Sequence, residues 1–242
     1  IIKHNNACGI ASSKDSLSSY LLALQADPLS AFGGVLISNT KIDYKTSLEV
    51  DKLFFEILIA PEFDKQALDI LKSKKNRIIL HQKTTNIQNL SYRNILNGVI
   101  QQDQDNIENN SKNWSLVTNT SANLDEIKDL EFANKIVKHS KSNAIVLVKN
   151  KQMISSGIGQ TSRIDALKFA IGKAKQFKFD ITGSSMASDA FFPFPDCVEI
   201  ASNVGISTIV QPGGSVKDDL SIQACNDKKI AMFFTGLRHF YH

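Results

Sequence analysis

The stretch that decides the fold reads Ala144-Ile145-Val146-Leu147-Val148-Lys149-Asn150-Lys151-Gln152-Met153-Ile154-Ser155-Ser156 and continues as Gly157-Ile158-Gly159-Gln160-Thr161-Ser162-Arg163. Its apolar runs, 144–148 and 152–156, predict a pair of strands turned by Asn150-Lys151. The glycine-containing segment then leads into a helix predicted over 164–175. This strand–strand–helix unit indicates an α/β protein.

Strands and helices alternate through the rest of the chain. Helices are predicted over 46–53, 64–74, 126–138, 196–203 and 218–225, and one more follows the cap oxygens of Ser12, Ser13 and Asp15 and ends at Asp27-Pro28. Strands are predicted over 31–37, 55–59, 77–80, 208–211 and 231–234. The alternation predicts a three-layer α/β/α sandwich with a largely parallel or mixed sheet.

A weak internal echo relates the two ends of the chain. Lys3-His4-Asn5 is similar to Lys138-His139 with Asn143, and Ser30-Ala31-Phe32 is similar to Asp189-Ala190-Phe191. A length of 242 residues suits one large domain or two intimate subdomains. We expect two subdomains, 1–125 and 126–242, with the first partial at its N-terminus.

A polar insert lies between these two parts. From about residue 81 to 123 the sequence is rich in Asn, Gln, Ser and Thr and has little periodicity. This composition predicts edge strands and loops, with a disordered tip near 101–112. We expect Trp114 to be a packing anchor and not a ligand platform.

Composition excludes several classes of protein. Hydrophobic content of 42% and charged content of 21% are typical of a globular protein, and no apolar run reaches the roughly 20 residues that span a bilayer. The net charge of +4 is mild and the lysines are scattered, which argues against a nucleic-acid surface. We therefore expect a soluble cytoplasmic protein without membrane or nucleic-acid partners. The start without methionine, inside a strand, suggests a fragment.

The three cysteines give no sign of a metal or disulfide framework. Cys8, Cys197 and Cys225 are widely separated and form no C-x-x-C pair. We expect each to be a small buried residue.

Four other segments carry groups suited to binding or catalysis. The first ten residues place Lys3 and His4 at the end of a strand, with Gly9 permitting a close turn. Residues 157–163 suit either a phosphate loop or a plain hairpin-to-helix turn. The Phe- and Pro-rich run 186–196 suits either a stiff loop that stacks a heteroaromatic ring or an aromatic core plug. Residues 211–215 form a turn after a strand, where amides could meet polar ligand atoms.

The C-terminal residues are expected to be docked. Residues 235–242 contain Arg238, His239 and His242 with two aromatic side chains. A frayed tail is the usual expectation, but an apolar strand immediately precedes this one.

Together these motifs resemble one family, the AICAR transformylases, which form the C-terminal part of a bifunctional purine-biosynthesis enzyme that is also an IMP cyclohydrolase. The matching segments run in family order over essentially the whole chain: 3–9, 27–34, 59–61, Ser142-Asn143, 157–163, 188–194, 211–215 and 237–240 with His242.

The resemblance implies transfer of a formyl group from 10-formyltetrahydrofolate to the 5-amino group of AICAR, giving FAICAR and tetrahydrofolate in IMP biosynthesis. It also implies two cytidine-deaminase-like subdomains and a homodimer with shared active sites. It implies no catalytic zinc, in agreement with the absence of H-x-E and P-C-x-x-C motifs. A K⁺ site near Ser140, Ser142 and Asp189 is implied as well.

The resemblance assigns roles to individual residues. His4 is expected to be the general base, and Lys3 and Asn143 to stabilise the transferring formyl group. The residues expected to bind AICAR are Gly33, Glu56, Asn143, Arg163, Phe191 and Arg238. The residues expected on the folate side are Ile164, Asp196, Ser215 and Val216, with Leu29, Phe32, Pro193 and Phe194 walling the pterin.

One departure bears on activity. The family also binds AICAR through an Arg-Tyr pair upstream of the Lys-His motif, and this sequence contains neither that pair nor the cyclohydrolase domain. The alternative to a formyltransferase is therefore a non-catalytic nucleotide-binding module of the same fold, inactive as a fragment.

Overall fold

The computed structural model describes residues 1–83, 89–107 and 109–241. The first part of the chain forms β1 (Ile2–Lys3), β2 (Asn6–Ala7), α1 (Ser16–Ala26), β3 (Gly34–Ile37), α2 (Tyr44–Asp51), β4 (Phe55–Ala60), α3 (Lys65–Leu71) and β5 (Ile78–His81). The insert forms β6 (Leu90–Ile95), β7 (Gly98–Asp103), the 3-10 helix Ser111–Asn113 and β8 (Ser115–Leu116). The last part forms α4 (Leu124–Lys138), β9 (Ile145–Lys149), β10 (Gln152–Gly157), α5 (Arg163–Gln176), β11 (Ser185–Ser188), α6 (Asp196–Asn203), β12 (Thr208–Gln211), α7 (Asp218–Asp227) and β13 (Ala231–Phe234).

The two main sheets repeat one topology. Their strand orders are β2-β1-β3-β4-β5 and β10-β9-β11-β12-β13, and β8 adds a further strand beside β13. In each sheet an antiparallel hairpin comes first, the next strand pairs antiparallel with it, and the last two strands are parallel additions. The protein is therefore α/β with mixed sheets, as the sequence predicts. β8 lies in the insert but pairs with the second sheet.

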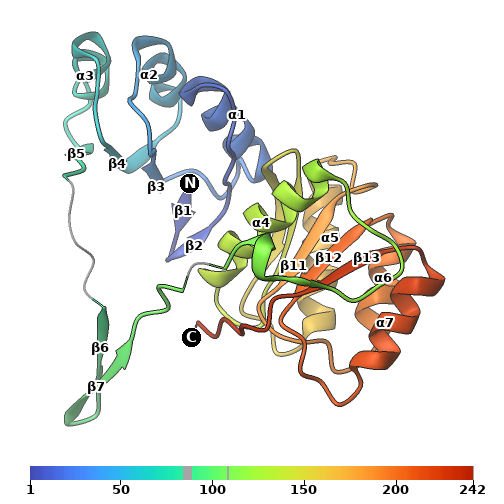
Figure 1. Ribbon diagram of the computed structural model, residues 1–242. Helices are drawn as coiled ribbons and strands as arrows, with labels where there is room; N and C mark the ends of the chain where they lie inside the picture. The colour runs from blue at the N-terminus through green and yellow to red at the C-terminus, as the bar shows by residue number, and fades with distance from the viewer. Residues whose placement is uncertain (84–88, 108, 242) are drawn as a thin grey trace.

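Helices cover both faces of the second sheet (Figure 1). Along β9, Ile145 and Leu147 pack with α5 and α6, whereas Val146 and Val148 pack with α4. Alternate side chains of a strand point to opposite faces, so a continuous apolar strand fits only between two layers of helices. This half is an α/β/α sandwich.

The first sheet has helices on one face. Leu36 and Leu58 are buried in a core formed with α1, α2 and α3. On the opposite face Ile37, Ile78 and Leu80 are 56%, 51% and 44% exposed. Among the described residues no helix takes the place that α4 has on the second sheet.

Local sequence signals explain most helix boundaries. The Asp15 side chain accepts a hydrogen bond from the Ser18 amide at 2.7 Å, and α1 ends at Asp27 immediately before a proline. Asn123 and Glu126 form a reciprocal capping box at α4. The Ser162 side chain caps α5 by accepting from the Asp165 amide.

Two predictions about irregular regions are wrong. Residues 186–188 belong to β11, a central strand of the second sheet, and not to the predicted loop. Residues 101–103 belong to β7, in a hairpin with β6 that projects away from both main sheets, and 111–113 are helical, so the predicted disorder is wrong there (Figure 1). Residue 108 of that tip lies outside the described residues.

The predicted packing anchor and buried thiols are confirmed. Trp114 is 9% exposed, donates to Asn109 Oδ1 at 2.6 Å and packs against Phe233 in the core under α4. All three cysteines are buried, and burial raises the pKa of both Cys197 and Cys225 to about 12. None of the helices in the described parts of the chain has the length and apolarity to cross a membrane.

Candidate active site

The hairpin between β1 and β2 presents His4 at its tip. Lys3 pairs with Asn6, which leaves His4 and Asn5 as a two-residue loop. Both loop residues have positive φ, 51° and 62°, as a type I′ turn requires. Asn and Gly are the usual residues there, so an exposed histidine in this backbone is strained. The predicted turn at Gly9 is wrong, since the chain turns at His4-Asn5.

Gly9 has a different role, which is close packing. A Cβ at Gly9 would lie 1.8 Å from the Ala23 carbonyl oxygen of α1. Gly157 is in the same position in the second half, where a Cβ would lie 1.9 Å from the Ala166 carbonyl oxygen of α5. Each glycine lets the backbone of the helix that follows a hairpin pack directly against the backbone at the glycine.

The Lys3 ammonium lies over a backbone turn of the first half. Its Nζ donates to the Phe32 carbonyl oxygen at 2.6 Å, and a Cβ at Gly33 would be 3.5 Å from that nitrogen. Gly33 has a φ of +69°, and the Phe32 ring packs against Phe54 at 4.9 Å. The structure thus brings together Lys3, Phe32 and Gly33, while Glu56 is an exposed residue of the neighbouring strand β4.

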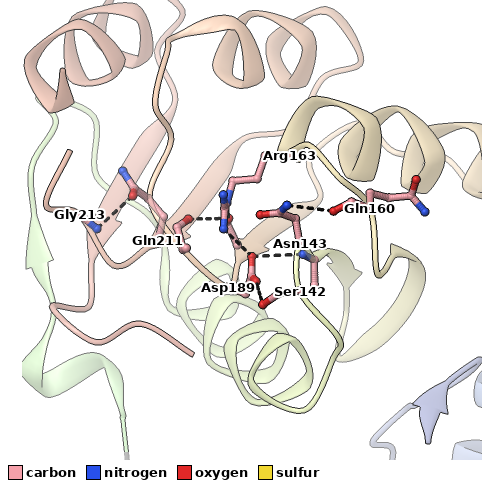
Figure 2. A network of polar contacts seen from close by, with 10 residues as sticks. Ser142, Asn143, Gln160, Arg163, Asp189, Gln211 and Gly213 are labelled. Carbon is pink, nitrogen blue, oxygen red and sulfur yellow. Dashed lines mark hydrogen bonds and ion pairs between the residues drawn. The ribbon is translucent and has the colours of Figure 1, made fainter. Parts of the chain in front are cut away.

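A second cluster surrounds the fully buried Asp189 at the end of β11 (Figure 2). Its Oδ1 accepts from Arg163 Nη2 at 3.1 Å and from the Ala144 amide at 3.2 Å, and its Oδ2 accepts from Ser142 Oγ at 2.5 Å. Arg163 Nε also donates to Ser188 Oγ at 3.2 Å. These bonds fix the plane of the guanidinium beside the Ser142-Asn143 backbone.

Asn143 is held against the glycine-containing loop. Its Nδ2 donates to the Gln160 carbonyl oxygen at 2.9 Å, and its backbone amide donates to the same oxygen at 3.1 Å. The Gly159 amide donates to the Lys141 carbonyl oxygen at 2.9 Å, and the Gln160 amide donates to Asn143. Because these two loop amides are bonded to residues 141–143, the structure favours the hairpin-to-helix turn over the phosphate loop.

The C-terminal segment is docked across this cluster, as predicted. The His239 amide donates to the Asp189 carbonyl oxygen at 3.0 Å, and the Ser142 amide donates to the Tyr241 carbonyl oxygen at 2.8 Å. The Arg238 guanidinium lies 5.1 Å from the centre of the Phe191 ring and 5.7 Å from that of Phe240. Three of the predicted AICAR ligands, Arg163, Phe191 and Arg238, therefore lie around Asp189. His242 lies outside the described residues.

The residues predicted for the folate side are more exposed than those around Asp189. Phe192 is a fully buried core residue, whereas Phe194 is 49% exposed beneath the Lys217 ammonium at 4.3 Å. Leu29 and Phe32, on the first half, are 70% and 62% exposed. Of the other five residues, Pro193 and Val216 are exposed, and Ile164 and Ser215 are half-buried. The half-buried Asp196 begins α6 and accepts from the Cys197 amide.

One contact joins the two clusters. Asn6, the cross-strand partner of Lys3, accepts a hydrogen bond at 3.4 Å from the backbone amide of Lys141, the residue before Ser142. The hairpin that carries His4 thus lies beside the loop that carries Asn143.

The residues predicted around K⁺ already have protein partners, and the K⁺ site stays a prediction. The Asp189 carboxylate already accepts three hydrogen bonds, and Arg163 neutralises its charge. The Ser140 hydroxyl donates to the Ile136 carbonyl oxygen. The described residues contain no group of three His, Cys, Asp or Glu side chains that could hold a metal ion.

The supporting contacts of several motif residues were not predicted from the sequence. Ser188, Gln160 and Gln211 lie within the motifs 188–194, 157–163 and 211–215 but received no role from the sequence. In the structure Ser188 orients Arg163, and the fully buried Gln211 accepts from the Gly213 amide at 3.0 Å (Figure 2). Recognition of β11 would have shown that Ser188 and Asp189 lie at a strand end, where polar residues commonly form sites in α/β folds.

Comparison with known proteins decides the family. The model of one family, described as AICARFT/IMPCHase bienzyme, matches residues 1–173. The chain belongs to this bienzyme family. It is 57% identical over 243 residues to the bifunctional purine biosynthesis protein PurH of Bacteroides thetaiotaomicron, and 44% identical over 246 residues to PurH of Aquifex aeolicus. Both alignments cover the whole of this chain, but only 48% and 47% of the two relatives. The chain therefore spans about half the length of its bienzyme relatives.

Solved structures show weaker similarity. A dCMP deaminase from cyanophage S-TIM5 is 16% identical, with a TM-score of 0.34 over 44% of this chain and 94% of that one. A diaminohydroxyphosphoribosylaminopyrimidine deaminase/5-amino-6-(5-phosphoribosylamino)uracil reductase from Thermotoga maritima is 20% identical, with a TM-score of 0.29 over 43% of this chain and 33% of that one. At these scores the likeness adds nothing to the functional argument.

Proposed function

We propose that this half of the bienzyme is the formyltransferase, which moves a formyl group from 10-formyltetrahydrofolate to the 5-amino group of AICAR. The observation that carries the proposal is His4, an exposed residue in a left-handed turn that directly follows Lys3 in the chain. Strained residues of this kind persist where function requires them. The family membership of the chain supports the substrate class.

The reaction needs a proton acceptor and an oxyanion donor. The amine nitrogen of AICAR attacks the formyl carbon, and the neutral imidazole of His4 takes the amine proton as the C–N bond forms. The carbonyl oxygen becomes an oxyanion, which Lys3 and the Asn143 amide stabilise. The intermediate then collapses as the bond to folate N10 breaks, and N10 leaves with a proton to give tetrahydrofolate and FAICAR.

The second cluster is proposed to bind the nucleotide. Arg163 and Arg238 provide guanidinium donors for anionic and carbonyl oxygens, and Phe191 provides a ring face for the imidazole. Gly33 and Glu56 are proposed to contact AICAR from the first half. Ile164, Asp196, Ser215 and Val216 are proposed to contact folate, with Leu29, Phe32, Pro193 and Phe194 around the pterin.

The active form is proposed to be a homodimer with shared sites. The projecting hairpin supports this, because Tyr92, Ile95, Val99 and Ile100 on it are each at least half exposed. An isolated two-stranded hairpin is marginally stable in water, and a second copy of the chain would cover these side chains. The cytoplasmic location stays a prediction.

The test is an absorbance assay with AICAR and 10-formyltetrahydrofolate, applied to this chain and to the complete reading frame that encodes it. We expect release of tetrahydrofolate from the complete protein, abolished by His4→Ala. Binding of AICAR without turnover would support the non-catalytic module instead. If the complete protein lacks formyl transfer and only cyclises FAICAR to IMP, the assignment of this half as the transferase is wrong.

A further inference from the structure

The C-terminal segment is anchored by one buried side chain. Within 236–241, His239 is buried with 3% exposure, while its neighbours Arg238 and Phe240 are exposed. Because Arg238 and His239 are adjacent in the chain, the buried imidazole and the exposed guanidinium are coupled through one short stretch of backbone. Whatever holds His239 therefore also sets the position of Arg238.

The partner of His239 comes from the polar insert. His239 Nδ1 lies 2.5 Å from Asp105 Oδ2, although 134 residues separate them. Lys138, at the end of α4, lies 3.1 Å from Asp105 Oδ1 and also donates to the Ile107 carbonyl oxygen. Asp105 thus joins the insert, α4 and the C-terminal segment.

The electrostatics favour a charged Asp105 in this position. Burial by itself would raise the pKa of Asp105, but the hydrogen bonds and positive charge of His239 and Lys138 outweigh it and lower the pKa. A carboxylate that accepts charge-assisted hydrogen bonds from two elements fixes both of them more firmly than neutral contacts do.

We propose that Asp105 is a positioning residue for nucleotide binding: through His239 it holds the C-terminal segment against Asp189 and so fixes the Arg238 guanidinium over Phe191. The carboxylate lies in the insert and reaches the guanidinium only through the imidazole and the backbone. This inference rests on the proposed role of Arg238 in binding AICAR.

The kinetic test compares Asp105→Ala with Asp103→Ala, which removes an exposed carboxylate two residues earlier. In the complete protein we expect Asp105→Ala to raise the KM for AICAR about tenfold and to change kcat less than about twofold, as for loss of uniform binding. Asp105→Asn, which keeps a hydrogen-bond acceptor, should recover part of the loss, and Asp103→Ala should match the wild type. A fall in kcat with unchanged KM would contradict the proposal.

A double-mutant cycle tests the route through Arg238. If Asp105 acts by placing the guanidinium, Arg238→Ala should add little loss of AICAR affinity in the Asp105→Ala background. Additive losses would show that Asp105 acts independently of Arg238 and would overturn the proposal.

A third measurement does not depend on formyl transfer. Amide hydrogen exchange over 235–241 should accelerate at least about tenfold in Asp105→Ala and stay unchanged in Asp103→Ala. Absence of formyl transfer by the wild type would reject the proposed function alone. Unchanged exchange in Asp105→Ala would reject the positioning role, whichever reaction the protein performs.

Discussion

Arg163 and Asp189 form an ion pair with 3.1 Å between Nη2 and Oδ1, in which the side chains are 13% and 0% exposed. The pair joins the start of α5 to the end of β11. It therefore couples the Arg163 guanidinium to the centre of the second sheet.

Removing the buried carboxylate should destabilise the second half. Asp189→Asn leaves Arg163 without its counter-charge, and loss of one partner of a buried pair costs about 3 kcal/mol or more. Urea unfolding measures the change. Asp180→Asn, which removes an exposed partner of Lys149, is the control and should change stability little. Equal effects of the two substitutions would contradict this view of the site.

Replacing His4 should separate stability from activity. His4→Asn puts a residue that accepts the left-handed turn where the imidazole was, so we expect folding to be stabilised by up to about 1 kcal/mol. Turnover should fall by about 10²- to 10⁴-fold, the usual contribution of a general base. Asn5→Gly keeps both the imidazole and the turn and should retain turnover. Retained turnover in His4→Asn would exclude His4 as the base.

The close approach at Gly157 predicts opposite effects for two glycine-to-alanine substitutions. In Gly157→Ala the added methyl group would overlap the Ala166 carbonyl oxygen, and the substitution should destabilise the fold by about 3 kcal/mol. Gly172→Ala adds a methyl group in open space on the exposed side of α5 and should stabilise by about 0.5–1 kcal/mol. Thermal unfolding of the two variants distinguishes these outcomes.

A buried ion pair between the halves predicts an acid-dependent loss of stability. Asp27, 2% exposed at the end of α1, pairs with Lys173 of α5 at 2.5 Å. Burial would raise the pKa of Asp27, but hydrogen bonds from Lys173 and Ser30 lower it below its ordinary 3.8. The unfolded chain therefore takes up a proton before the folded one, and the pair's contribution, present above about pH 4, is lost as pH falls through the lowered pKa.

Asp27→Asn tests that prediction. The variant should be less stable than the wild type at neutral pH, and the difference should shrink as pH falls below 4. A constant difference across this range would show that the charge of Asp27 contributes nothing. The measurement is urea unfolding at a series of pH values.

Sequence patterns predicted the elements that depend on local signals. The ranges 196–203, 208–211 and 231–234 match α6, β12 and β13 at both ends, because the proline before α6 and the apolar runs of the two strands mark them. β11 was not predicted because two of its four residues are serines, which are not typical of a buried strand. Its burial depends on neighbouring strands that are distant in sequence. The hairpin tip at His4 was missed because histidine is not a usual turn residue.

In the site, too, local features were predictable and long-range contacts were not. Its residue types were predictable from motifs, whereas their connections were not. The contact between Asp105 and His239 and the contact between Asn6 and Lys141 each join segments more than 130 residues apart. No local pattern encodes such pairs, since they result from how the two halves and the insert pack.

The uncovered face of the first sheet has a consequence for how the chain denatures. Fewer apolar side chains are buried around this sheet than around the second, so it should open at a lower urea concentration. The only tryptophan, Trp114, is buried in the core under α4 and reports on the second half alone, whereas far-ultraviolet circular dichroism reports on both. We therefore expect the dichroism to change before the fluorescence. Coincident curves would instead mean that the two halves unfold as one cooperative unit.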